Sequence, residues 1–398
     1  MGAHAVDGNH YDIVTIDTLP GEEEIVTKHE SEQDAAGATG SLTRSDGVPG
    51  ARHTPLRLVP QFSGRAGEYF GIWLVNVLLS IITLGIYSAW AKVRTEQYFY
   101  ANTRLAGASF QYLASPLSIL KGRLIAIAIV ATLVLSAQFL PLVYAMLALG
   151  LALSWPALVV LALRFRARNS AWRGLRFRFT GDVGDAYGPF LGWRILTGLT
   201  MTLAYPAMKR RQHEFLVEGH AFGQHAFRFH GITGKYFKPY LIALAFGVVA
   251  LSGIGLVAVL VAAGAESGPA AEAAGLALFA VMAVVYPGAF VMAIMLSVRY
   301  HNLLWNNTTM GQHRFEATMR VRDMLWLYFS NAVAMLFTLG LATPWATTRL
   351  ARYRAAHFAV LPGGSLDEFI ALADGEHSAA GAELVDALDT GVDLEFGM

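Results

Sequence analysis

The chain has 398 residues, of which 55% are hydrophobic and only 15% are charged. A length of this kind could hold about two or three soluble domains, but the apolar residues gather in long uncharged blocks that soluble domains do not show. The composition therefore excludes an ordinary soluble protein and predicts an α-helical polytopic membrane protein. There is no cysteine, so disulfide bonds and thiolate metal sites are excluded as well.

Charge is strongly segregated along the chain, although the formal net charge is only +1. Residues 1–50 hold ten acidic residues against two basic ones, and residues 363–398 hold nine acidic residues and no Lys or Arg. We therefore expect a disordered acidic amino-terminal tail (1–60), a membrane domain (61–362) and an acidic carboxyl-terminal tail (363–398). The excess of basic residues in the membrane domain predicts contact with anionic lipid headgroups or an anionic solute.

The amino end is expected to stay in the cytoplasm, because the first fifty residues lack the basic start and apolar core of an export signal. Beyond it, seven apolar segments follow one another, and a crossing helix needs about 20 apolar residues. Pro141 lies near the middle of one long uncharged run, which predicts a helical hairpin with a turn at this proline. The segments are Tyr69–Ala91, two within Leu124–Leu163, Tyr187–Met208, Pro239–Ala265, Ala273–Val298 and Met324–Thr348.

The fourth segment is weaker than the others because it contains Arg194. An arginine at the centre of a crossing helix costs about 2.5 to 3.5 kcal/mol on insertion scales. The segment is therefore marginal as a membrane span, and its arginine is the first candidate for a residue of an anion or proton pathway. Near the start of the segment it could equally extend its side chain to the lipid headgroups.

Three stretches repeat one pattern, in which an acidic residue lies fifteen residues before a threonine and an arginine lies eleven after it. An aromatic residue follows each arginine by four positions, namely Tyr98, Phe215 and Tyr353. We predict three repeat copies, at residues 62–112, 179–229 and 315–362. The matched sets are Glu68, Thr83 and Arg94; Asp185, Thr200 and Arg211; and Asp323, Thr338 and Arg349.

A second pattern, Arg-x-x-Asn-x-x-Trp, follows each long apolar hairpin. Arginine and tryptophan are typical of the membrane–water interface, so these residues are expected to act as interface anchors. They are Arg166, Asn169 and Trp172, and Arg299, Asn302 and Trp305.

Short stretches of alternating aromatic and polar residues predict strands of β-hairpins outside the bilayer. An open sheet edge is not stable in lipid, so we expect these strands to pair on one face of the membrane. The stretches are Gly107–Tyr112, Gly174–Phe179, His225–His230 and Gly311–Glu316.

Basic loops predict the topology. By the positive-inside rule they belong in the cytoplasm, whereas the turn near Pro141 and the linker 264–275, which carry no Lys or Arg, belong outside. The three repeat segments then enter and leave on the same side, and only the four helices of two hairpins cross. If all seven segments span, basic loops must lie on both faces, so the expectation is four to seven spans and short cytoplasmic β-hairpins. The basic loops are 92–123, 164–185, 209–238 and 299–322.

The stretch "EYFGIWLVNVLLSIITLGIYSAWAKVRTEQYFYANT", followed by Phe-x-Tyr, resembles the signature of the YjgN-like bacterial inner-membrane proteins, a domain of unknown function. "WRGLRFRFTGD" and "TLGLATPWATTRLARYRAAHF" are similar to the central and distal parts of the same family, and the resemblance covers about Phe62 to Phe369. It implies a multi-pass inner-membrane protein and brings no established activity or catalytic residues. The middle copy departs from the pattern, because it lacks the Leu-Gly pair and the tryptophan.

Candidate functional residues are the acid and arginine of each copy. They lie 26 residues apart, about 39 Å along a continuous helix, and so can pair only between copies or in a copy that folds back. One interpretation is structural bracing at the interface, and the other is a ligand or ion pathway that includes Arg194. The residues concerned are Arg194, Glu68, Asp185, Asp323, Arg94, Arg211 and Arg349.

Other chemistries are not favoured. The histidines at 213, 220, 225 and 230 lack the spacing of a zinc site, and the sequence contains no phosphate-binding loop, nucleophile-elbow string or cofactor motif. Arginine and aromatics alternate in "WRGLRFRF", which indicates a packed strand rather than nucleic-acid binding. We expect transport or binding of a small or lipid-like anionic ligand; the alternative is a membrane scaffold that recruits protein partners through its acidic tails, and an enzyme is favoured least.

Overall fold

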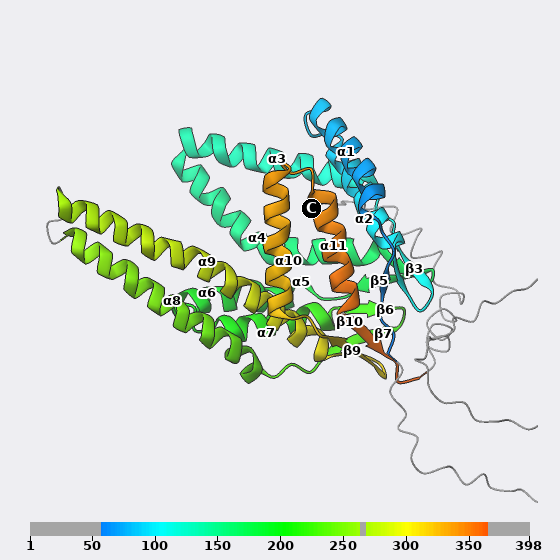
Figure 1. Cartoon of the computed structure of the whole chain (residues 1–398). Coiled ribbons are helices and arrows are strands. Elements are labelled where there is room, and N and C mark those ends of the chain that lie inside the picture. The colour runs from blue at the N-terminus through cyan, green and yellow to red at the C-terminus, as the bar shows by residue number, and fades with distance from the viewer. Residues whose placement is uncertain (1–56, 263–267, 365–398) are drawn as a thin grey trace, which may run out of the picture. The chain divides into compact units, whose positions relative to one another are not determined.

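The computed structural model describes residues 57–262 and 268–364, so the two predicted acidic tails lie almost entirely outside the described residues. Figure 1 shows long helices that lead away from a region of short strands. The helices are α1 (Ala66–Ile82), α2 (Ser88–Ala101), α3 (Pro116–Phe139), α4 (Pro141–Arg168), α5 (Val183–Tyr187), the π-helical η1 (Gly188–Gly192), α6 (Trp193–Leu199), α7 (Tyr205–Glu218), α8 (Thr233–Ala262), α9 (Pro269–Asn306), α10 (Val321–Phe337) and α11 (Thr343–Ala356). The strands are β1 (Gln61–Phe62), β2 (Thr103–Leu105), β3 (Ala108–Tyr112), β4 (Ser170–Trp172), β5 (Leu175–Phe179), β6 (His220–Phe222), β7 (His225–Phe229), β8 (Thr308–Met310), β9 (His313–Ala317) and β10 (Phe358–Leu361).

Four helices of the described chain, α3, α4, α8 and α9, are long and apolar enough to cross a membrane, with mean hydropathies of 2.0 to 2.5. At most 17% of the most apolar window of each is buried inside the protein. Such helices need lipid around them, because water would meet almost their whole apolar surface. Pro141 occupies the first turn of α4, where its missing N–H costs no helical hydrogen bond. The prediction of a helical membrane protein is confirmed.

The other long uncharged runs are not single helices. In the run 69–91, α1 ends at Ile82, and Leu84 and Gly85 have positive φ angles of 51° and 92°. The Thr83 hydroxyl donates to the Leu79 carbonyl at 2.7 Å and accepts from the Tyr87 N–H at 2.9 Å. One threonine thus pairs backbone groups on both sides of the break, so the chain folds back without leaving them unpaired.

The corresponding threonines of the other two segments bond in the same way. Thr338 donates to Ala334 at 2.7 Å and accepts from the Ala342 N–H at 3.0 Å. Thr200 donates to Leu196 at 2.8 Å and accepts from the Ala204 N–H at 3.1 Å. Each segment therefore becomes a pair of short helices, α1–α2, α6–α7 and α10–α11.

The middle segment makes this turn without a glycine. Met201 and Thr202 have φ angles of 47° and 72°, and a positive φ is unfavourable for a side chain branched at Cβ. Tyr240 of α8 compensates for this conformation. Its hydroxyl donates to the Thr202 carbonyl at 2.7 Å and lies 2.8 Å from the Thr202 hydroxyl. A contact from a neighbouring helix thus offsets the unfavourable backbone conformation that glycine adopts without strain in the other two segments, at Gly85 and Gly340.

The ten strands of the described residues form one sheet in chain order, and every strand is antiparallel to the next. Leu58 and Val360 add a last antiparallel bridge, in which each N–H donates to the other carbonyl at 2.8 to 2.9 Å. Because this bridge links the start of the sheet to its last strand, the ten strands form a closed ring. A closed sheet leaves no edge for pairing with another chain.

The connections between the strands alternate in kind. Two-residue turns join β2 to β3, β4 to β5, β6 to β7 and β8 to β9, and helices make the other five connections in the described chain. Ala106 and Gly107 both have positive φ, the pattern of a type I′ turn, which matches the twist of a hairpin. Since antiparallel neighbours alternate in direction, all the helical connections leave from one edge of the ring and the tight turns lie at the other.

Aromatic and aliphatic side chains fill the ring. Phe222, only 1% exposed, packs against Trp172 and Phe177 with ring centroids 5.9 and 4.9 Å away. Alternate residues of a strand lie on the same face of the sheet, and nearly every strand contributes such residues to this core. The core residues are Leu105, Trp172, Leu175, Phe222, Met310, Phe315 and Val360, with Leu58, Phe110, Phe177, Phe227, Trp305 and Phe358 among the partly buried residues packed on them.

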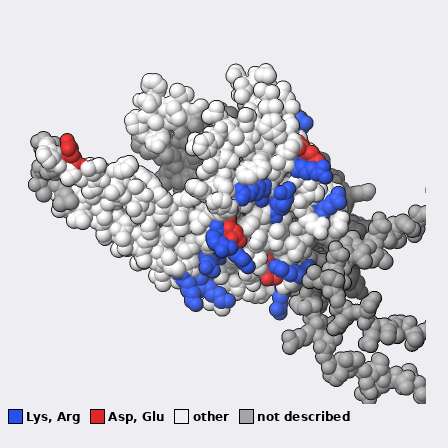
Figure 2. Space-filling view, viewed as in Figure 1, with Lys and Arg blue, Asp and Glu red and all other residues white. Residues whose placement is uncertain are grey.

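The basic side chains are concentrated near the ring of strands and are absent from much of the apolar helices. On the face drawn in Figure 2, Lys and Arg gather around the strands and the helix ends that join them. The outer part of the α8–α9 hairpin carries none of them on that face. The first turn of α9 contains the acidic Glu272 instead. Charge therefore marks the edge of the apolar region, where a bilayer would end.

Candidate functional site

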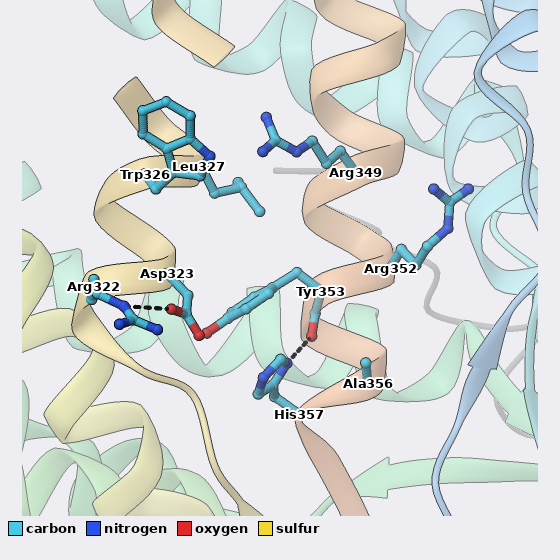
Figure 3. A pocket seen from close by; sticks show the side chains of 9 residues that line it. All are labelled: Arg322, Asp323, Trp326, Leu327, Arg349, Arg352, Tyr353, Ala356 and His357. Carbon is cyan, nitrogen blue, oxygen red and sulfur yellow. Dashed lines mark hydrogen bonds and ion pairs between the residues drawn. The ribbon is translucent and has the colours of Figure 1, made fainter. Parts of the chain in front are cut away.

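A cavity of about 690 Å³ lies between α10 and α11, close to the point where α11 leads into β10. It contains Asp323 and Arg349, the acid and the arginine of the third predicted copy. The turn at Thr338 folds α11 back along α10, so two residues that are far apart along the chain line one space. The lining residues are Arg322, Asp323, Trp326, Leu327, Arg349, Arg352, Tyr353, Ala356 and His357, drawn in Figure 3.

Arg349 is held in place by neutral partners. Its guanidinium donates to the Ser330 hydroxyl at 2.6 Å and to the Asn331 side-chain oxygen at 3.2 Å. It also lies 5.0 Å from the centre of the Trp345 ring, within the range of a cation–π contact. None of these partners neutralises its charge, so Arg349 retains a full positive charge for a ligand in the cavity.

Asp323 lies beside the side chains of Arg322 and Tyr353. Its carboxylate pairs with Arg322 at 3.3 Å, and the side chain of Arg322 is 86% exposed, so this pair contributes little to stability. The Tyr353 ring points toward Asp323 (Figure 3). Burial, with the nearby carboxylate adding to it, raises the pKa of Tyr353. The phenol donates to the Arg320 carbonyl at 3.4 Å and accepts from the Arg320 N–H at 3.0 Å, so it joins α11 to the start of α10.

The lower part of the cavity is aromatic and basic. His357 stacks on Tyr353 with ring centroids 4.0 Å apart, and its Nδ1 lies 2.9 Å from the Tyr353 carbonyl oxygen. Arg352 donates to the Gly64 carbonyl at 3.1 Å. In Figure 3 its guanidinium points away from Asp323, whereas those of Arg322 and Arg349 lie on the side of α10. Two guanidinium groups and one carboxylate thus share this space. Such an excess of planar cations suits the oxygens of a phosphate or carboxylate.

A second cavity, of about 530 Å³, lies at the corresponding place of the middle segment and contains Asp185 and Arg211. Its charges differ, because Glu214 stands where α11 has Arg352, and Glu214 pairs with Arg211 at 2.9 Å. Glu218, another acid of this cavity, matches Ala356. Since its arginine is already neutralised, this cavity is a poor site for an anion.

The remaining predicted pathway residues do not gather. Glu68 accepts a hydrogen bond of 3.4 Å from the Tyr98 hydroxyl, whereas Arg94 donates to the Tyr87 hydroxyl at 3.1 Å. Arg194 lies exposed on α6. Glu68, Arg94 and Arg194 therefore remain candidates from the sequence pattern alone. Of the three acid–arginine pairs, the structure brings two into shared cavities.

The structure places the expected interface anchors differently from the prediction. Trp172 is only 5% exposed and belongs to the core of the ring, and Trp305 packs against Phe315 and Phe358 in the same core. Asn169 closes the end of α4, and its side chain donates to the Phe165 carbonyl at 2.8 Å. The side chain of Asn302 donates to the Met319 carbonyl at 2.8 Å. Arg166 and Arg299 are exposed. The two tryptophans thus pack in the protein interior, because Trp172 is part of β4 and Trp305 lies near the end of α9, just before β8.

Sequence reasoning missed Arg322, Trp326, Arg352 and His357 as members of the site. One signal could have identified Arg352: together with Arg349, Tyr353 and Ala356 it follows a spacing of three, four and seven residues, which places all four on one face of a helix. No such signal marks His357, because it lies beyond the end of α11. In the described part of the chain no cluster of three or more His, Asp or Glu could hold a metal ion.

Comparison with known proteins agrees with the membrane character of the fold. The family model "Bacterial protein of unknown function (DUF898)" matches residues 57–387. The chain is similar to the inner membrane protein YjgN of Escherichia coli O157:H7, with 33% identity over 119 residues, and of Escherichia coli K12, with 34% identity over 119 residues; each match covers 30% of both chains. It is also similar to YjgN of Salmonella typhimurium LT2, with 50% identity over 54 residues, 14% of each chain.

These matches span less than a third of the length of the curated relatives. No solved structure matches the chain. The family model, by contrast, covers most of the sequence and all of the described residues. The chain therefore belongs to the YjgN-like family of bacterial membrane proteins, DUF898, whose function is unknown.

Proposed function

We propose that this protein binds the anionic headgroup of a membrane amphiphile in the cavity between α10 and α11. The observation that carries the proposal is that Arg322 and Arg349 line one space that contains a single carboxylate, Asp323. Trp326, which is 62% exposed, lies at the same cavity, and tryptophan prefers the depth of lipid headgroups. A lipid phosphate could thus reach the arginines while its chains stay in the bilayer.

Binding at the interface is favoured over conduction through the ring of strands. Aromatic side chains fill the space that the ring encloses, as Phe222 and Trp172 illustrate. A route along the ring axis would require these rings to leave a close-packed core, which is costly. The alternative function, a scaffold that recruits partners through the acidic tails, depends on segments outside the described residues.

The arrangement of the connections supports a topology for this function. All five helical connections of the described chain leave from the same edge of the ring, so we place the ring in the cytoplasm and let only α3, α4, α8 and α9 cross the membrane. The short helical pairs α1–α2, α6–α7 and α10–α11 then enter and leave on the cytoplasmic side. The positive-inside rule favours this orientation because the basic residues lie around the ring.

Single cysteines are expected to report this topology without background, because the native chain contains none. Arg104→Cys, Arg176→Cys and Arg314→Cys lie on exposed positions of three different strands, and Leu140→Cys lies between α3 and α4. In intact cells, a membrane-impermeant thiol reagent should modify only the cysteine at 140. In inverted vesicles it should modify only the other three. Labelling of positions 104 and 176 from opposite sides would contradict the proposed topology.

Arg349→Gln is expected to weaken binding of short-chain phosphatidylglycerol to the purified full-length protein by about tenfold to a hundredfold. A hydrogen bond between charged groups contributes about 1.5 to 3 kcal/mol, and glutamine keeps only a neutral donor. Isothermal titration calorimetry in detergent micelles measures the change. Arg211→Gln is the matched control, since its arginine is already paired with Glu214, and it should bind as the wild type does.

Two further measurements separate the possible outcomes. Arg349→Lys should recover part of the affinity if charge is what the ligand needs, whereas a purely structural role would leave both variants equally impaired. Competition by millimolar inorganic phosphate would identify a small anion as the ligand, and the absence of competition would identify the lipid. Equal affinity of the wild type and Arg349→Gln for phosphatidylglycerol would refute the proposal.

A further inference from the structure

A separate cavity of about 470 Å³ lies where α2 and β3 meet the sheet ends of the candidate membrane helices α3 and α4. One part of its lining is apolar and comes largely from α3 and α4. The other part is polar and comes largely from α2 and β3. The lining residues are Ile119, Val159, Ala162, Leu163 and Phe165 on the apolar part, and Lys92, Glu96, Tyr100, Tyr112 and Arg166 on the polar part.

The corresponding place in the second half of the chain is occupied by side chains. The sequence alignment that matches Thr83 with Thr200 also matches Ile119 with Tyr236 and Glu96 with His213. Tyr236 is fully buried there, and its hydroxyl lies 2.8 Å from His213 Nδ1. The smaller Ile119 thus leaves space in the first half where Tyr236 fills the second.

The polar part of the cavity presents both signs of charge. Lys92 and Arg166 of its lining are exposed, and Glu96 is half-buried. The two tyrosine rings lie 5.4 Å apart, and the Tyr100 hydroxyl lies 3.1 Å from the Ser170 hydroxyl. Burial raises the pKa of Tyr112 to about 12, so its hydroxyl remains a neutral donor. Two cations, one carboxylate and two aromatic rings together match a ligand that carries a phosphate and an ammonium group.

We propose that this cavity binds a zwitterionic phospholipid of the phosphatidylethanolamine type. Lys92 and Arg166 receive the phosphate, Glu96 receives the primary ammonium, and the first carbons of an acyl chain lie against Ile119, Val159 and Leu163. The volume is of the size that small-molecule sites have, roughly 300 to 1,000 Å³, and suits a headgroup with the start of its chains. The site differs from the cavity between α10 and α11 in position and in ligand charge, so either site can fail while the other holds.

Ile119→Tyr introduces into the first half the side chain that fills the second, and it is expected to reduce bound phosphatidylethanolamine at least tenfold. The measurement is native mass spectrometry with equimolar phosphatidylethanolamine and phosphatidylglycerol. Every protein compared carries Arg349→Gln in the full-length chain, so that phosphatidylglycerol at the cavity between α10 and α11 does not contribute. Ile127→Tyr, on the same helix at a position that is 63% exposed, is the matched control and should retain the lipid. The reference protein, Arg349→Gln alone, should prefer phosphatidylethanolamine.

Glu96→Gln supplies an independent test, because a neutral amide at a half-buried position preserves shape and should not disturb folding. This variant should lose the preference for phosphatidylethanolamine over phosphatidylglycerol while it still binds phospholipid through Lys92 and Arg166. If Ile119→Tyr does not fold, the preference of Glu96→Gln decides the question alone. Equal binding of the two lipids by the Arg349→Gln reference, or an unchanged preference when Glu96→Gln is added to it, would overturn the assignment.

Discussion

Phe222→Ala is expected to lower the free energy of unfolding by about 3 to 5 kcal/mol, the largest effect we anticipate for a single truncation. The Phe222 side chain is 1% exposed and packs between Trp172 and Phe177 inside the closed ring. Its removal leaves a cavity that strands joined on both sides cannot close. The thermal midpoint of the purified protein in detergent, followed by tryptophan fluorescence, should fall strongly.

Phe139→Ala is the matched control for this truncation. Phe139 is 76% exposed at the end of α3, so the same change removes almost no contact within the protein. Its thermal midpoint should stay within a few degrees of the wild type. Equal midpoints for Phe222→Ala and Phe139→Ala would mean that the ring of strands does not form the core described above.

Acidification is expected to destabilise the protein through His213. Burial, followed by the positive charge of nearby Lys209, lowers the pKa of His213 from 6.5 to about 3. In the unfolded chain His213 binds a proton below about pH 6.5. In the folded protein it stays neutral down to about pH 3. Because the unfolded state binds more protons in this window, stability falls as the pH falls, by up to about 1.4 kcal/mol per pH unit.

His213→Gln is expected to remove this part of the acid sensitivity. Glutamine can still hydrogen-bond to the Tyr236 hydroxyl, which lies 2.8 Å from Nδ1 in the native protein, but it does not titrate. Thermal midpoints measured between pH 7.5 and 4.5 should decline less steeply in the variant than in the wild type. Above pH 7 the two slopes should agree, because His213 is neutral in both the folded and the unfolded state. Parallel curves over the whole range would contradict the assigned pKa.

Several features of the fold could be predicted from local sequence. The membrane helices α3, α4, α8 and α9 follow from uncharged runs long enough to cross a bilayer. The start of α4 follows from Pro141, because proline is tolerated in the first turn of a helix and breaks its interior. The alternating stretch Gly174–Phe179 contains β5, as a period of two requires. In each case the determining interaction lies within a few residues of the chain.

Other features could not be predicted because they depend on partners distant in the sequence. The run 69–91 has the composition of a membrane span, yet the bonds of Thr83 and the positive φ of Leu84 and Gly85 divide it into two short helices. Hydropathy measures transfer to lipid and does not detect such a turn. The role of Trp172 was missed for a similar reason, since tryptophan suits both a lipid interface and a protein core.

The candidate site also depends partly on local sequence and partly on contacts between distant segments. The repeated acid and arginine identified Asp323 and Arg349, but their separation of 26 residues did not indicate whether they could meet. The turn at Thr338 places α11 alongside α10, so that Asp323 and Arg349 line one cavity. The same turn brings Tyr353 and His357 to that cavity. The charge of Arg349 is not neutralised from position 352, because Arg352 stands there, whereas the middle segment has Glu214, which pairs with Arg211.

The sequence by itself determined that this is a helical membrane protein with basic residues beside its apolar helices, because burial in lipid and the cost of charge there act on each residue separately. Only the tertiary structure decided that Leu58 pairs with Val360 and closes the strands into a ring. A strand pattern specifies which face is apolar but not which strand will pair with it. Ring closure, and with it the single edge from which all the described helical connections leave, arises from hydrogen bonds between segments at opposite ends of the described chain.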